Sequence, residues 1–179
     1  MADMALVVLL RGVNVGGHRR FRPSTFAQQL RKYDIVNLGA TGTFVVWKPG
    51  PKAKFRAELF RKLPPDTAVA LCDGREFTRL VMENPFGKEQ PSPDVVRFVS
   101  VLTGPARIRP ILPITFPSNG EWLVRVLASS GRSVFGEYRR HMKTITYLSQ
   151  IDKLFGVRAT TRSWNTILAI VEILEKGSE

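Results

Sequence analysis

The order of predicted elements in residues 5–72 is the feature that most restricts how this chain can fold. Apolar runs bounded by glycine, proline or charged residues predict four strands, at 5–10, 35–38, 44–47 and 68–72. Helical spacing of apolar residues predicts two helices, one from Pro23 through Tyr33 and one from Lys52 to Leu63. The resulting order, strand-helix-strand-strand-helix-strand, is typical of a ferredoxin-like unit.

The rest of the chain predicts a second unit. A third helix carries Phe77 and Leu80, and the segment 85–94 that follows is rich in proline, which favours a linker. Beyond it we expect strands and then two helices, within the ranges 95–102, 111–116, 122–127, 135–138, 145–155 and 164–175. The predicted fold class is α+β with two subdomains: a ferredoxin-like one at 1–84, a Pro-rich linker at 85–94, and a C-terminal one at 95–179 with a smaller antiparallel sheet and two helices.

The charge balance points to an anionic partner. The chain of 179 residues has 27 Lys and Arg against 15 Asp and Glu, which gives a net charge of +12. No carboxylate occurs between Met4 and Tyr33, so the N-terminal third is the electropositive part. A charge of this size attracts nucleic acids and phosphorylated metabolites, although it also serves solubility alone.

The single cysteine, Cys72, excludes an internal disulfide and suits a reducing compartment. The apolar run at the N-terminus is only six residues long, too short for a signal sequence or a membrane span. We therefore expect a cytoplasmic protein without a membrane partner.

The segment Arg-Gly-Val-Asn-Val-Gly-Gly at 11–17 is the strongest candidate binding site. It follows a predicted strand, and its glycines allow the backbone to approach a ligand closely. Its spacing matches neither a dinucleotide-binding fingerprint nor a P-loop. The alternative is a turn that needs no ligand, stabilised by glycine and asparagine. The candidate anion-binding residues of this region are Arg11, Asn14, Gly16, Gly17, Arg19 and Arg20.

Four motifs together resemble one known family. They are the segment 11–17, the glycine-centred hairpin at 41–46, Asn-Pro-Phe at 84–86, and Ala-Thr-Thr-Arg-Ser-Trp-Asn-Thr at 159–166. This pattern is similar to the bacterial domain-of-unknown-function family numbered 1697. The resemblance implies a cytosolic α+β protein whose N-terminal half is ferredoxin-like, and it implies no particular activity.

The resemblance adds four candidate binding residues. Thr41 lies in the predicted hairpin, at a position where the family has the sequence Gln-Ser-Gly-Asn. Lys143 and Thr144 correspond to a cation and a hydroxyl in the family's Gly-Arg-Ser/Thr-Lys segment. Arg162 belongs to the C-terminal motif, in which Ser163 replaces an asparagine. Each also has a structural interpretation, because Thr144, and Thr161 or Ser163, are suitable N-caps for the helices that follow.

Catalytic sets are scarce. Two histidines, His18 and His141, and one cysteine do not make a Cys/His metal cluster, so we expect no metal and no cofactor. Paired carboxylates at useful spacing are absent, and the catalytic residues are unknown. We expect binding of an anionic ligand or a nucleic-acid backbone through the 11–17 segment. The alternatives are a transferase or hydrolase acting on a phosphorylated small molecule, and a protein-interaction module without catalysis; the oligomeric state stays open.

Overall fold

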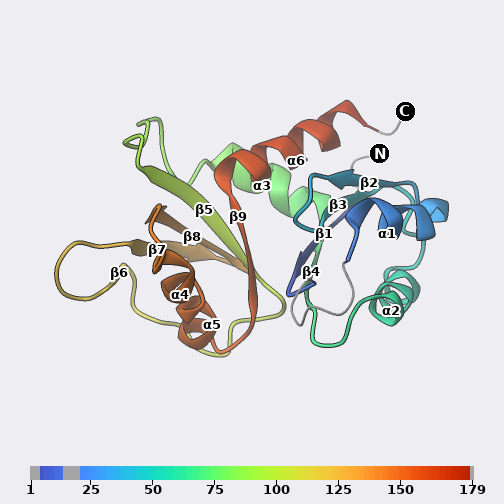
Figure 1. Ribbon diagram of the computed structural model, residues 1–179. Helices are drawn as coiled ribbons and strands as arrows, with labels where there is room; N and C mark the ends of the chain where they lie inside the picture. Colours follow the sequence, from blue (N-terminus) through green and yellow to red (C-terminus); the bar gives the residue numbers. More distant parts are fainter. Residues whose placement is uncertain (1–4, 14–20, 178–179) are drawn as a thin grey trace. The chain divides into compact units, whose positions relative to one another are not determined.

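The computed structural model describes residues 5–13 and 21–177 (Figure 1). By their internal contacts the residues form two units. The N-terminal unit comprises Met1–Met82 together with Ala169–Glu179, and the C-terminal unit comprises Glu83–Leu168.

The N-terminal unit has the predicted ferredoxin-like topology. Its elements are β1 (Leu6–Arg11), α1 (Pro23–Gln29), the 3-10 helix η2 (Arg31–Tyr33), β2 (Ile35–Leu38), β3 (Thr43–Val46), α2 (Lys52–Lys62), β4 (Ala68–Asp73) and α3 (Gly74–Glu83). The strands lie in the order β2-β3-β1-β4, and neighbours run antiparallel. Helix α1 joins β1 to β2, and α2 joins β3 to β4; in both cases one other strand lies between the two strands joined. This confirms the predicted order of elements.

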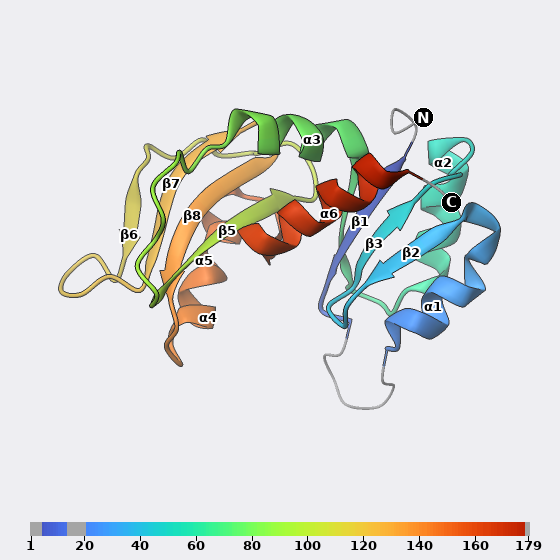
Figure 2. The same ribbon diagram turned by 90° about the horizontal axis from the view of Figure 1, so that it is seen from above.

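Alternation along β1 explains the core of this unit. Leu6, Val8 and Leu10 belong to one buried cluster, which they share with side chains of α1 and α2. Both helices therefore cover the same face of the sheet (Figure 2). The helix residues of this cluster are Phe26, Leu30, Tyr33, Phe55 and Leu59, which include the apolar positions that predicted the first helix.

The C-terminal unit is a second antiparallel sheet. Its elements are β5 (Val95–Leu102), β6 (Ile114–Phe116), β7 (Val124–Ser130), β8 (Ser133–Arg139), α4 (Thr144–Leu148), α5 (Gln150–Phe155) and β9 (Ala159–Ser163). The strand order is β6-β7-β8-β5-β9. The last helix, α6 (Trp164–Lys176), begins in this unit and ends in the N-terminal one.

Two details of the sequence prediction were wrong. The second sheet has five strands against four in the first, so it is not the smaller one. The additional strand is β9, because residues 159–163 pair with β5 instead of forming only the approach to a helix. The predicted helix at 145–155 is divided at Ser149, whose hydroxyl donates to the Thr146 carbonyl oxygen at 2.6 Å and so competes with the helical pattern.

One face of the second sheet carries the core of the C-terminal unit. Phe98 and Leu102 of β5 pack in a cluster with Ile151 and Phe155 of α5. These helix residues come from the apolar stripe that the sequence predicted, and burying them holds α5 against the sheet.

The segment predicted as a linker is partly packed. Asn84 and Gly87 form a turn, with the Gly87 N–H donating to the Asn84 carbonyl oxygen at 3.1 Å. Phe86 within this turn contacts the rings of Phe135 and Trp164, with centroid distances of 6.4 and 5.1 Å. The start of the segment is thereby anchored in the C-terminal unit, and the linker role of 85–94 stays a prediction.

Candidate functional site

Arg11 and Thr41 lie at the same end of the N-terminal sheet. The β1–β3 register pairs Leu9 with Thr43, and the Leu10 N–H donates to the Gly42 carbonyl oxygen at 2.9 Å. Arg11 follows Leu10 and Thr41 precedes Gly42, so both residues flank this hydrogen bond at the end of the sheet where β1 stops. Arg11 is half-buried and Thr41 is exposed. The structure therefore places two of the predicted binding positions at the same end of the sheet, where the Thr41 hydroxyl lies 3.4 Å from the Thr43 hydroxyl.

Glycine at position 42 makes this approach of the hairpin to β1 feasible. A Cβ at Gly42 would lie 2.9 Å from the Leu10 Cβ, and its φ of +83° belongs to the left-handed region. A larger residue would push the turn away from β1. This gives a physical reason for the glycine-centred hairpin that the sequence analysis singled out.

The chain leaves β1 through Gly12, whose φ is +82°. Asn14, Gly16, Gly17, Arg19 and Arg20 lie outside the described residues. Their assignment to a binding site therefore stays a prediction from the sequence.

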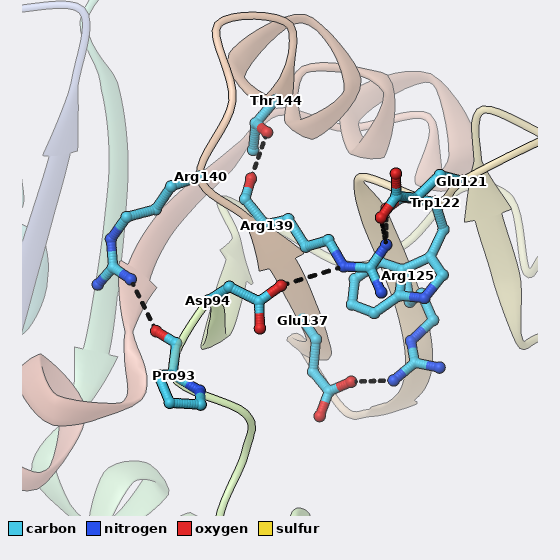
Figure 3. A network of polar contacts seen from close by, with 9 residues as sticks. All are labelled: Pro93, Asp94, Glu121, Trp122, Arg125, Glu137, Arg139, Arg140 and Thr144. Carbon is cyan, nitrogen blue, oxygen red and sulfur yellow. Dashed lines mark hydrogen bonds and ion pairs between the residues drawn. The ribbon is translucent and has the colours of Figure 1, made fainter.

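Lys143 and Thr144 lie in the C-terminal unit, where β8 leads into α4. Thr144 is buried, and its hydroxyl donates to the Arg139 carbonyl oxygen at 2.5 Å, tying the helix to the end of β8 (Figure 3). The predicted N-cap role was wrong, since α4 begins at Thr144 itself with no side-chain cap. Lys143 is exposed at the position before the helix.

Arg162 is a buried cation on β9. It pairs with Val99 of β5, and its Nη1 donates to the Thr161 carbonyl oxygen at 2.9 Å. Only 9% of the residue is exposed, and this desolvation lowers the pKa of its guanidinium to about 10. The side chain still carries its charge at neutral pH. The next residue, Ser163, accepts the Thr166 N–H at 3.3 Å and caps α6, which confirms one of the two predicted caps.

An arginine row across the second sheet was missed by the sequence analysis. Glu137 of β8 is paired in register with Arg97 of β5 on one side and Arg125 of β7 on the other. Its Oε2 accepts from the Arg125 Nη2 at 2.5 Å, and its Oε1 lies 3.7 Å from the Arg97 Nε (Figure 3 shows the Arg125 contact). Each residue sits within an ordinary strand pattern, so only the register reveals that the three charges meet.

Trp122 extends this row toward the sheet end. The guanidinium carbons of Arg125 and Arg139 each lie 4.1 Å from its ring centroid. Arg139 also donates through Nη1 to Glu121 at 2.8 Å and lies 3.6 Å from Asp94 (Figure 3). The row therefore links β5, β8 and β7 through the ion pairs of Glu137 with Arg97 and Arg125.

Metal-ligand clusters do not occur within residues 5–13 and 21–177: no group of three or more His, Cys, Asp or Glu side chains there could hold an ion. Cys72 is 1% exposed on β4. A thiol buried in this way packs as a small apolar side chain.

The fold is that of an α+β protein, with a ferredoxin-like unit built on a four-stranded sheet and a second unit built on a five-stranded antiparallel sheet. The chain belongs to the family described as "Protein of unknown function (DUF1697)", whose model matches residues 4–116. This match confirms the family resemblance. The C-terminal motif at 159–166 lies outside the matched residues, so the match does not test it.

Among solved structures, the chain is similar to the conserved bacterial protein SP0830 from Streptococcus pneumoniae. The two share 13% sequence identity over 95% of this chain and 98% of that chain, with a TM-score of 0.62. At this identity the similarity shows the fold alone. A comparison with curated proteins finds no match. In the part of the chain that the structure describes, helices with the length and apolar character of a membrane span are absent.

Proposed function

We propose that the N-terminal unit binds a phosphate-bearing ligand at the end of its sheet where β1 stops. The observation that supports the proposal is that Arg11 and Thr41 flank the Leu10–Gly42 hydrogen bond at that end of the sheet. A guanidinium offers paired N–H donors that match phosphate oxygens, and a hydroxyl can donate as well.

The surrounding sequence supports an anionic ligand. Arg11 leads into a segment whose cations are Arg19, Arg20 and Arg22, with no carboxylate before Asp34. The positive potential of such a segment adds to that of Arg11 and raises the local concentration of anions. The proposal uses residues of the N-terminal unit only; the binding roles of Lys143, Thr144 and Arg162 stay predictions.

The phosphate belongs either to a nucleic-acid backbone or to a small phosphorylated molecule. Binding to a backbone weakens steeply with salt, by about 0.7–0.9 log units per log unit of salt for each phosphate neutralised. A small ligand held by one or two cations has a shallow dependence. Filter-binding titrations of a single-stranded RNA and of a DNA duplex at two salt concentrations, with pyrophosphate as the small ligand, separate the two.

The first prediction concerns Arg11→Gln. We expect this substitution to weaken binding of whichever of these ligands the wild-type protein retains by about tenfold or more, since charge-assisted hydrogen bonds contribute about 1.5–3 kcal/mol. The matched control is Arg31→Gln, which removes the same charge in the same unit. Arg31 belongs to η2, which leads directly into β2. The first residue of β2 and the first residue of β1 both pair with Val46 of β3, so β2 begins at the end of the sheet where β1 begins. Arg31 therefore lies at the opposite end of the sheet from Arg11.

Equal losses in the two variants would show that only overall charge matters and would overturn the proposed site. Failure of the wild-type protein to retain RNA, DNA or pyrophosphate at low salt would overturn the function as well. Retention of RNA or DNA with a steep salt slope would identify the nucleic-acid backbone as the ligand.

A further inference from the structure

The C-terminal unit contains a cavity that the proposed function does not use. Its volume is about 430 Å³, and it lies between the segment 105–110 and the tip of the β7–β8 hairpin. This volume is within the range typical of small-molecule sites. The lining residues that matter here are two arginines, a serine and two prolines: Arg109, Arg132, Ser129, Pro105 and Pro110.

Hydrogen bonds hold both walls of this cavity in place. The N–H groups of Arg107 and Ile108 both donate to the Phe155 carbonyl oxygen, at 2.9 and 3.1 Å, which ties the segment 105–110 to the end of α5. Across the cavity, the Leu102 N–H donates to the Arg132 carbonyl oxygen at 2.8 Å, fixing the hairpin tip to the end of β5.

Glycines at two positions allow this arrangement. A Cβ at Gly156 would lie 3.0 Å from the Arg107 Cβ, so only glycine lets the segment 105–110 approach the end of α5 this closely. Gly131, with φ of +58°, occupies the first position of the two-residue turn between β7 and β8, where glycine is favoured. Backbone contacts therefore fix the positions of both walls of the cavity.

The charge of the cavity and its surroundings is positive. The cavity contains Arg109 and Arg132, and a second hollow, which Arg107 of the same segment borders, also contains Lys153 and Arg158. The acid in that hollow is Asp152, whose Oδ1 accepts the Ala159 N–H at 3.0 Å. An anion entering the cavity therefore meets the guanidinium groups of Arg109 and Arg132, and none of the residues that line the cavity is acidic.

We propose that this cavity binds a small organic phosphate, with the phosphate held by Arg109 and Arg132 and the carbon part against Pro105 and Pro110. Two guanidinium groups suit the several oxygens of a phosphate, and the Ser129 hydroxyl adds a donor. The apolar rings of Pro105 and Pro110 offer a surface against which the carbon part of such a ligand can pack. This site is separate from the one proposed for the N-terminal unit and uses none of its residues.

The test is calorimetric titration of the full chain with adenosine monophosphate, inorganic phosphate and adenosine. We expect the nucleotide to bind most tightly, because adenosine alone lacks the anion and phosphate alone lacks the ring. Arg109→Gln and Arg132→Gln should each weaken nucleotide binding about tenfold or more. The matched control is Arg107→Gln, two residues away on the same segment, which borders the second hollow and should change the affinity less than about threefold.

Absence of nucleotide and phosphate binding to the wild-type protein would overturn this proposal. Equal losses in Arg107→Gln and Arg109→Gln would also overturn it, since the effect would then come from general charge. Circular dichroism of each variant shows whether it is folded, and Arg109→Lys serves if the glutamine variant is not, with a smaller loss expected. Arg11→Gln separates the two sites: a loss of nucleotide binding in that variant but not in Arg109→Gln would place the nucleotide in the N-terminal unit and refute the cavity site.

Discussion

At the level of single residues, the Glu58 carboxylate binds two side chains of the N-terminal unit. The Tyr33 hydroxyl donates to its Oε2, and the Lys32 Nζ lies 2.9 Å from the same oxygen. The hydrogen bond from Tyr33, followed by that from Lys32, lowers the pKa of Glu58 below its usual 4.5. The same bond to Glu58 raises the pKa of Tyr33 above 10.0, because the bond requires the phenol proton.

These shifts predict an acid-sensitive contribution to stability. A carboxyl whose pKa is lower in the folded state stabilises the fold above its unfolded pKa, and this contribution is lost as the pH falls through about 4.5 and below. Glu58→Gln should therefore lower the melting temperature at pH 7 and reduce the further drop on acidification. Thermal unfolding at pH 7 and at pH 4 measures both effects. The control Glu89→Gln removes an exposed carboxylate, and the same change in it would refute a specific role for Glu58.

At the level of elements, the second sheet depends on how closely β8 approaches its neighbours. Gly136 of β8 lies opposite Phe98 of β5 and Val126 of β7. A Cβ at this position would lie 2.3 Å from the Arg125 carbonyl oxygen and 2.5 Å from the Phe98 Cζ. Just beyond it the β7–β8 register shifts between Val126 and Ala128, so the strand already departs from regular pairing there.

We expect Gly136→Ala to destabilise the protein by about 3 kcal/mol, the upper end of the usual cost of overpacking, because the conflicting atom is backbone. The matched control is Gly104→Ala, which adds the same methyl group where no atom lies within 4 Å. Urea denaturation of both variants measures the difference. Similar stabilities would mean that β7 and β8 separate readily at this point.

At the level of the whole molecule, the net charge of +12 opposes folding through mutual repulsion. Cations gather on individual elements: α2 carries Lys52, Lys54, Arg56, Arg61 and Lys62 against the single acid Glu58. The exposed ion pair between Lys52 and Asp73, at 3.0 Å, offsets little of this repulsion, because such pairs contribute about 0–1 kcal/mol.

Sodium chloride should therefore stabilise this protein. Raising its concentration from a low to a physiological level shortens the screening length to about 8 Å and weakens the repulsion. We expect the melting temperature to rise by about 2–4 °C, which corresponds to roughly 1 kcal/mol for a chain of this size. Lys54→Gln, which removes an exposed cation from the first turn of α2, should reduce this rise. A melting temperature that falls with salt would show that ion pairs outweigh repulsion.

How far the sequence predicted the structure depends on the range of the interactions involved. Strand β1 and the helix positions Phe26, Leu30 and Phe55 follow a local period, and the order of elements in the N-terminal unit could be predicted from such periods. Strand β9 was missed because Thr160, Thr161 and Ser163 also suit a helix start, and only pairing with β5 makes them a strand. The row of Arg97, Glu137 and Arg125 was missed for the same reason, since it exists only in one register.

The sequence by itself determined the α+β class, the ferredoxin-like order of the first unit, its family and its positive charge, because these depend on local periodicity and composition. Only the tertiary structure decided that Arg11 and Thr41 lie at the same end of the first sheet, and that Arg109 and Arg132 line one cavity. Both depend on strand register and on backbone hydrogen bonds between segments far apart in the chain. A sequence pattern carries no direct record of such pairings.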